Sequence, residues 1–255
     1  MTDHIKTELN DGVLSIRFNR PDKKNALTQK MYAAMADALS RSNADDEVRV
    51  VFLAGTAECF CAGNDLGDFL AGSMDDQDRP SIRFINDIAT AEKPIVAAVG
   101  GAAIGVGMTM LLHCDLVYAA PNAKLHFPFV NLAIIPEAGS TYLLPRMVGH
   151  QRAAELFLLG EPFDAPSARE FGIVNDIFPA DELIDRAYEK ACTLARKAPT
   201  AVRQTKALMK GDLAPLLERV SEEVALIGPM IASPEAREVM SAFMEKREPD
   251  FSKAS

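Results

Sequence analysis

Apolar and polar positions alternate along two stretches near the start of the chain, residues 5–9 and 13–18. Such alternation is typical of half-buried strands, and Asn-Asp-Gly between the stretches is a turn signal, so the pattern predicts a β-hairpin. An apolar run at 48–54, interrupted only by Arg49, and an unbroken one at 95–99 instead indicate buried strands. Further short strands are predicted at 115–119, 124–127 and 173–178.

Helical periodicity alternates with these strands. Thr28 is predicted to cap a helix that reaches about residue 42, and Ser81 one that reaches about residue 91. The other helices expected before residue 180 cover 107–113, 137–148 and 151–159. Every element predicted after residue 180 is a helix, at 181–197, 200–210, 213–231 and 234–246. The pattern therefore gives an α/β core domain over 1–195 and a helical C-terminal part over 196–255, with an acidic segment at 72–80 that is expected to be mobile.

Composition narrows the class of protein. The chain has 255 residues, 48% of them apolar, and a net charge of −9 without a basic stripe, which argues against nucleic acid as a partner. No stretch of about 18 apolar residues runs without interruption by a charge or a turn signal, so no membrane span is expected. The cysteines at 59, 61, 114 and 192 lack the spacing of a zinc site, so no metal is predicted. With no secretory segment at the N-terminus, we expect a cytoplasmic protein with reduced thiols.

The stretch 93–119 carries the clearest sign of chemistry. Glycines at 100, 101, 105 and 107 lie between a predicted strand and a predicted helix. Such a turn lets the backbone approach a ligand, and a helix start offers unpaired N–H groups, so the loop is able to hold a developing negative charge. A tight structural turn is the alternative. Two carboxylates follow before residue 143: Asp115 at the head of a strand, and Glu137 where a helix is expected to begin. For Glu137, catalysis and a favourable interaction with the helix dipole both remain open.

Three motifs add a resemblance to a known family. They are KPIVAAVGGAAIGVG with CDLVYA (93–107 and 114–119), FNRPDKKNAL (18–27) and FCAGNDL (60–66). Together they resemble the crotonase superfamily of enoyl-CoA hydratases and isomerases, over almost the whole chain. The resemblance implies a spiral of β-β-α turns whose helical C-terminal part packs against neighbouring subunits in a homotrimer or a dimer of trimers. It also implies an acyl-CoA thioester as substrate, with no cofactor besides the coenzyme A that the substrate brings.

The resemblance assigns roles to single residues. The backbone N–H groups of Asn64 and Val106 would form the oxyanion hole, although the family usually has glycine where Val106 stands, so the donor requires a negative φ there. Hydratases place two glutamates at the positions of Thr109 and Phe129. Glu137 instead matches the single glutamate of the peroxisomal-type Δ3,Δ2-enoyl-CoA isomerases. Asp115 falls in a segment that is structural in the family.

The same comparison predicts how coenzyme A is held. The residues carried over as substrate and coenzyme A contacts are Lys24, Ala26, Leu27, Ala62, Asp65, Leu66, Gly105 and Pro136, with Phe243 and Lys246 closing the nucleotide site. Arg20 and Lys23 are expected to be solvated loop charges. His126 is expected to be a packed strand residue, and a residue that lines the acyl pocket is the alternative. The predicted function is an enoyl-CoA isomerase with Glu137 as acid and base. An enoyl-CoA hydratase and a non-catalytic acyl-CoA-binding protein are the alternatives.

Overall fold

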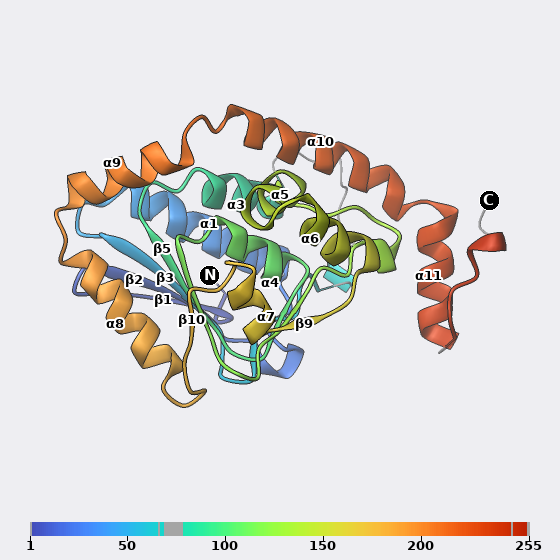
Figure 1. The fold of residues 1–255 in the computed structure, drawn as a ribbon, viewed down its shortest axis with the longest axis horizontal. Coiled ribbons are helices and arrows are strands. Elements are labelled where there is room, and N and C mark those ends of the chain that lie inside the picture. Colours follow the sequence, from blue (N-terminus) through green and yellow to red (C-terminus); the bar gives the residue numbers. More distant parts are fainter. Residues whose placement is uncertain (1, 66, 69–78, 246, 254–255) are drawn as a thin grey trace.

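The computed structural model describes residues 2–65, 67–68, 79–245 and 247–253, and Figure 1 shows their arrangement. Leu66, Lys246 and residues 72–78 of the segment expected to be mobile lie outside these ranges. Two β-sheets form the centre of the molecule, and most helices lie against them.

The first sheet has the strand order β1-β2-β3-β5-β7-β10. β1 (Ile5–Asn10) and β2 (Val13–Phe18) form the predicted antiparallel hairpin, and Asp11 and Gly12 at its tip have φ of 49° and 79°. Two positive φ values in a two-residue loop match the twist of the flanking strands. The parallel strands are β3 (Val50–Ala54), β5 (Ile95–Val99), β7 (Leu116–Ala119) and β10 (Asp176–Ile177). The strand predicted at 173–178 is thus limited to two residues.

A second sheet, in the order β4-β6-β8-β9, was only partly predicted. It consists of β4 (Cys59–Cys61), β6 (Ala102–Ile104), β8 (Lys124–His126) and β9 (Phe163–Asp164). Each pass of the chain adds one strand to each sheet, β3 then β4, β5 then β6, β7 then β8. This is the expected spiral of β-β-α turns. β4 and β6 were predicted as loops because segments of three residues are too short to show a period.

Helices α1 (Gln29–Ala44) and α3 (Pro80–Ala89) pack against each other. Thr28 caps α1 as predicted, since its hydroxyl accepts the N–H of Met31 at 3.3 Å. Ser81 does not cap α3: the helix begins with Pro80, whose missing N–H is tolerated in the first turn. The following helices are α4 (Val106–Thr109), which continues as a 3-10 turn over Met110–His113, a 3-10 turn over Val130–Leu132, α5 (Ser140–Val148), α6 (His150–Ala154) with a π-turn over Glu155–Leu159, and α7 (Ala165–Glu170).

The last four helices surround the core. They are α8 (Leu183–Ala195), α9 (Pro199–Lys210), α10 (Ala214–Ile231) and α11 (Pro234–Glu245). Figure 1 shows α9 and α10 along one edge of the core and α11 beyond it. On α9, Lys206 Nζ donates to Asp115 Oδ2 at 2.8 Å, and the same oxygen accepts the N–H of Ile95 at 2.7 Å. Asp115 is therefore structural, as predicted. The division of the chain near residue 195 stays a prediction.

The helices within the described ranges include none that combines the length and apolar character of a membrane span.

Candidate active site

Two loops distant in sequence run side by side and orient the amide of Asn64. The N–H of Leu27 donates to the carbonyl of Gly63 at 2.8 Å, and the N–H of Asp65 donates to the carbonyl of Leu27 at 2.9 Å. In this parallel pairing the residue between the two bonds turns its own N–H to the opposite side. Within the described ranges, the N–H of Asn64 meets no acceptor. It is available to a ligand.

The second outward amide is that of Val106. Gly105 precedes it with φ of +57°, a conformation that favours glycine, and directs the chain into α4. Val106 is the first residue of α4, so its N–H has no preceding helical carbonyl. Its φ is negative, which fulfils the condition for a donor at a non-glycine residue. A Cβ placed on Gly105 would lie 3.9 Å from the Cα of Gly63, so a methyl group there would be in van der Waals contact with the turn of Gly63.

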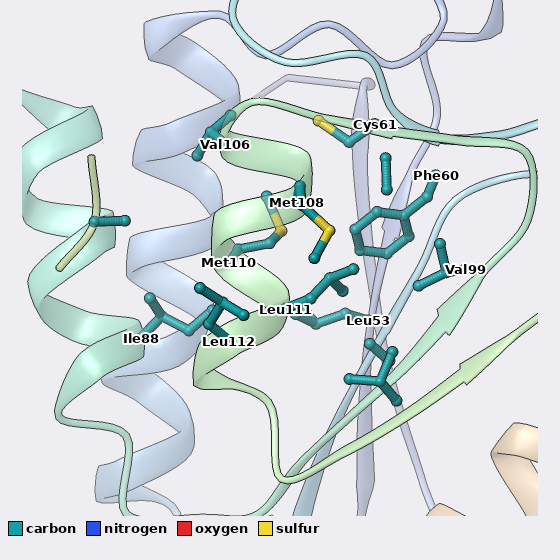
Figure 2. Close-up of a cluster of buried hydrophobic side chains, with 14 of the residues drawn as sticks. Leu53, Phe60, Cys61, Ile88, Val99, Val106, Met108, Met110, Leu111 and Leu112 are labelled. Atoms are coloured by element: carbon teal, nitrogen blue, oxygen red, sulfur yellow. The ribbon is translucent and has the colours of Figure 1, made fainter. Parts of the chain in front are cut away.

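A dense apolar cluster fixes α4 in place. Figure 2 shows Met108, Met110 and Leu111 packed among side chains from the strands and from α3, with Val106 at the start of the helix. Each of the three methionine and leucine side chains is almost fully buried. Interiors packed at this density resist displacement, so the Val106 amide is held by the core rather than by its own loop.

Glu137 lies outside the helix in which it was expected. Its carbonyl accepts the N–H of Ser140 at 3.1 Å, closing a tight turn in which Ala138 and Gly139 have φ of 61° and 66°. Because α5 begins only at Ser140, the prediction that a helix begins at Glu137 is wrong, and Glu137 lies outside the first helical turn. Ala138 in the left-handed region costs about 1 kcal/mol, so the turn is maintained by its surroundings.

The carboxyl group of Glu137 is in an unusual environment. Its Oε1 is buried and, within the described part of the chain, receives no hydrogen bond. Burial and, second, the charge of Glu223 raise the pKa of Glu137 to about 7. A carboxyl group with a pKa near neutrality is suited to take up and release a proton at physiological pH.

Glu137 is close to the oxyanion-hole loops. Burial and then the charge of Glu137 raise the pKa of Tyr32 well above its usual value. The hydroxyl of Tyr32 in turn donates to Asn64 Oδ1 at 2.6 Å. Burial also raises the pKa of Cys61 to about 12, with Glu137 contributing. Both side chains are therefore neutral at pH 7 and leave Glu137 without a counter-charge from α1 or β4.

The sequence interpretation overlooked two residues that support this site. Tyr32 carries a hydroxyl on the mostly apolar buried face of α1, which was a signal that could have been used. Asn25 is fully buried; its Nδ2 donates to the carbonyl of Cys59 at 2.9 Å, and its Oδ1 accepts the N–H of Arg20 at 2.8 Å. These bonds dock the loop around Asn25 onto β4.

Most of the residues predicted to contact coenzyme A lie along the two paired loops, whereas Gly105 precedes α4 and Pro136 precedes Glu137. Lys24 is exposed, Ala26 and Ala62 are half-buried, and Leu27, Gly105 and Pro136 are buried. Asp65 is bound by Arg20 Nη1 at 2.8 Å, and the same nitrogen donates to the carbonyl of Ala26 at 2.9 Å. Hydrogen bonding by Arg20 lowers the pKa of Asp65. Arg20 is thus a cross-link between the loops, and the prediction of a solvated charge was wrong, whereas Lys23 is exposed as expected.

The C-terminal residues predicted to contact coenzyme A lie outside the described side chains. Phe243 belongs to α11, but its side chain is not described, and Lys246 and Leu66 lie outside the described residues. His126 is a packed strand residue, as predicted, with Nε2 donating to the carbonyl of Gly160 at 2.7 Å.

The positions at which hydratases carry glutamates hold no acid or base here. Thr109 is fully buried and its hydroxyl donates to the carbonyl of Val106 at 3.4 Å. Phe129 is buried as well. The site therefore combines two outward amides with a single carboxyl group that lacks a hydrogen-bond donor among the described residues.

A carboxyl group near two outward backbone amides is an arrangement that is chemically capable of acid–base transfer next to a developing oxyanion. The chain belongs to the enoyl-CoA hydratase/isomerase family, whose sequence profile matches residues 8–254. The crystal structure of an enoyl-CoA hydratase/isomerase from Pseudoalteromonas atlantica T6c is similar, with a TM-score of 0.94 and 42% identity over 98% of this chain and 100% of that one.

Curated relatives catalyse different reactions. The 2,3-dehydroadipyl-CoA hydratase of Escherichia coli K12 is 34% identical over 94% of both chains. The peroxisomal enoyl-CoA delta isomerase 3 of Mus musculus is 36% identical over 78% of this chain and 65% of its own length. Membership of the family is therefore clear, while hydratases and isomerases are both among the relatives.

Proposed function

We propose that the protein is a Δ3,Δ2-enoyl-CoA isomerase in which Glu137 carries the proton. One observation supports this choice above the others: Glu137, whose Oε1 is buried, interacts electrostatically with Tyr32 and Cys61 near the loop of Asn64. Thr109 and Phe129, by contrast, occupy the positions of the hydratase glutamates. Moving a double bond requires one group that takes a proton and returns it.

The steps follow from the positions of these groups. The thioester oxygen accepts the N–H groups of Asn64 and Val106. Glu137 removes a proton from C2, and the electron pair of that C–H bond moves toward the thioester carbonyl, forming a dienolate whose negative oxygen the two amides stabilise. The same carboxyl group then delivers its proton to C4, so the double bond ends between C2 and C3. This second transfer returns Glu137 to its ionised state, so no other proton donor or acceptor is needed.

Hydration requires more than this site offers. One group must take a proton from water while another protonates C2. Thr109 cannot act as a base here, because its hydroxyl is buried and donates to the carbonyl of Val106. Phe129 has no titratable group. An enoyl-CoA hydratase remains the alternative because one of the relatives is named a hydratase.

A product assay tests the proposal. The protein is incubated with a 3-enoyl-CoA and, separately, with a 2-enoyl-CoA, and products are separated by chromatography. We expect conversion of the 3-enoyl to the 2-enoyl thioester and at most slow formation of the 3-hydroxy thioester. Efficient hydration would favour the hydratase, and no turnover of either substrate would favour a non-catalytic acyl-CoA-binding protein.

The binding of coenzyme A by this chain is part of the same proposal. Lys24, exposed at the rim of the paired loops, would meet a phosphate, while Ala26, Leu27 and Ala62 would line the path of the pantetheine. Arg20 already holds Asp65, which keeps the two loops at a fixed separation. That coenzyme A enters only with the substrate, that no further cofactor is needed and that the location is cytoplasmic stay predictions.

We also propose a homotrimer or a dimer of trimers. Large apolar side chains remain exposed on the C-terminal helices, including Leu208 (82%), Met209 (78%) and Leu226 (57%). Exposed apolar residues on neighbouring helices are typical of a surface that meets another chain. Sedimentation velocity at micromolar concentration should give a particle of three or six chains, and a monomer would contradict the proposal.

A further inference from the structure

One peptide group next to Glu137 is held from two sides. It joins Ala138 to Gly139, both of which have positive φ. Its carbonyl, that of Ala138, accepts a hydrogen bond from His113 Nε2 at 2.8 Å. Its N–H, that of Gly139, donates to Glu223 Oε2 at 2.6 Å. His113 ends the 3-10 turn that continues α4, and Glu223 lies on α10, so two separate elements fix this peptide.

Each partner has the protonation state that its contact requires. A carbonyl oxygen can only accept, so Nε2 of His113 carries the proton; burial lowers the pKa of this histidine to about 4, which keeps the ring neutral at pH 7. Glu223 accepts two further hydrogen bonds, from the N–H of Thr141 at 3.1 Å and from its hydroxyl at 2.6 Å. Burial raises the pKa of Glu223, and the three hydrogen bonds oppose this shift because they favour the ionised carboxylate.

α10 also closes the space around this turn. A Cβ on Gly139 would lie 2.4 Å from Leu216 Cδ1 and 3.1 Å from Val220 Cγ2, so the turn and α10 are packed without a gap. Glu223 is 2% exposed and sits on the same helix as these two residues. The backbone that carries Glu137 therefore cannot move unless α10 moves with it.

We infer that Glu223 is a positioning residue for the proposed base: through the Ala138–Gly139 peptide, which His113 holds from the other side, it fixes the turn that presents the Glu137 carboxyl group to the substrate. The inference rests on the proposed function of Glu137. It makes α10, an element of the C-terminal helical part, a component of the active site. Glu223 itself touches neither the substrate nor the reacting atoms.

Placement of this kind affects the chemical step more than substrate binding. A displacement of about 1 Å of a reacting group can cost on the order of 100-fold in rate. The contacts of the thioester oxygen are made by Asn64 and Val106, on other loops, so they do not depend on Glu223. Loss of Glu223 should therefore lower kcat and leave KM nearly unchanged.

The decisive variant is Glu223→Gln, which keeps the size of the side chain but removes its charge. Steady-state kinetics with a 3-enoyl-CoA should show kcat reduced about 10- to 100-fold, with KM within about threefold. The matched control is Glu218→Gln, an exposed position on the same helix that loses the same charge. A purely structural role would lower the melting temperature of Glu223→Gln and leave kcat unchanged.

The pH profile gives a second readout that a structural role would not move. Among the described residues, the titratable groups around Glu137 and its turn are Glu223 on α10, Tyr32 on α1, Cys61 on β4 and His113 at the end of the 3-10 turn. Of these, Glu223 raises the pKa of Glu137. Removing its negative charge should shift the acid limb of kcat/KM toward lower pH in Glu223→Gln but not in Glu218→Gln.

Hydrogen–deuterium exchange keeps the test independent of turnover. The N–H groups of Gly139 and Thr141 should exchange faster in Glu223→Gln, seen by mass spectrometry of a peptide that covers 137–141. If the wild type fails to isomerise, the proposed function is wrong, and the exchange result still decides whether Glu223 fixes the turn. Unchanged exchange, or unchanged kcat in an active wild-type background, overturns the inference. If Glu223→Gln does not fold, Glu223→Asp, with the charge kept and the reach shortened, should show the same losses to a smaller degree.

Discussion

Glu137→Gln should reduce isomerisation of a 3-enoyl-CoA by about 10²–10⁴-fold, the contribution typical of a positioned acid–base group. Glutamine keeps the shape of the side chain but cannot take the proton from C2. Because the thioester oxygen is held by the amides of Asn64 and Val106, affinity for a CoA ester should stay within a few-fold of the wild type. Single-turnover kinetics and calorimetric titration with a non-reactive CoA ester separate these two effects.

A matched control accompanies this variant. Glu161→Gln removes a carboxylate from an exposed position that is remote in sequence from the oxyanion-hole loops, and it should leave activity unchanged. The wild-type pH profile supplies a second check. Burial and Glu223 raise the pKa of Glu137 to about 7, and the base acts only when ionised, so kcat/KM should rise with pH and reach half its plateau near pH 7. An active Gln variant would show that another group transfers the proton.

Val106→Pro should lower kcat by about 10²–10³-fold, the usual consequence of removing one oxyanion-hole donor. Proline has no N–H, and the first position of a helix is the one place where α4 tolerates it, since no intrahelical hydrogen bond is lost there. The loss should appear in kcat and kcat/KM together, because the amide acts most strongly on the charge that develops in the transition state.

Val106→Gly is the control for this change. It restores the residue that the family usually has and keeps the N–H, so kcat should remain near that of the wild type. Some stability should be lost, about 2 kcal/mol, because the Val106 side chain is 1% exposed and its burial is forfeited. Comparable kcat in a folded Val106→Pro variant, with the fold verified by circular dichroism, would place the donor elsewhere.

Elements with strong local signals were predicted correctly from the sequence. The hairpin follows from alternation around Asn-Asp-Gly, and β5 follows from an unbroken β-branched and alanine run, because side-chain period and turn chemistry act within a few residues. The same holds for α9, α10 and most of α1, whose periodicity persists over several turns. The family motifs added Asn64, Val106 and Glu137 as candidates, which lie in three segments of the chain.

What brings these residues together was decided by the tertiary structure. β4 and β6 exist because each is paired with a strand distant in sequence, a gain that no local pattern records. The sequence determined that position 137 carries a carboxylate. The conformation of its turn, the lack of a hydrogen bond to Oε1 among the described residues and the raised pKa depend on packing by α10 and on the charge of Glu223, which lies 86 residues later in the chain. Burial and electrostatic interaction depend on distance in space, and the sequence by itself does not contain those distances.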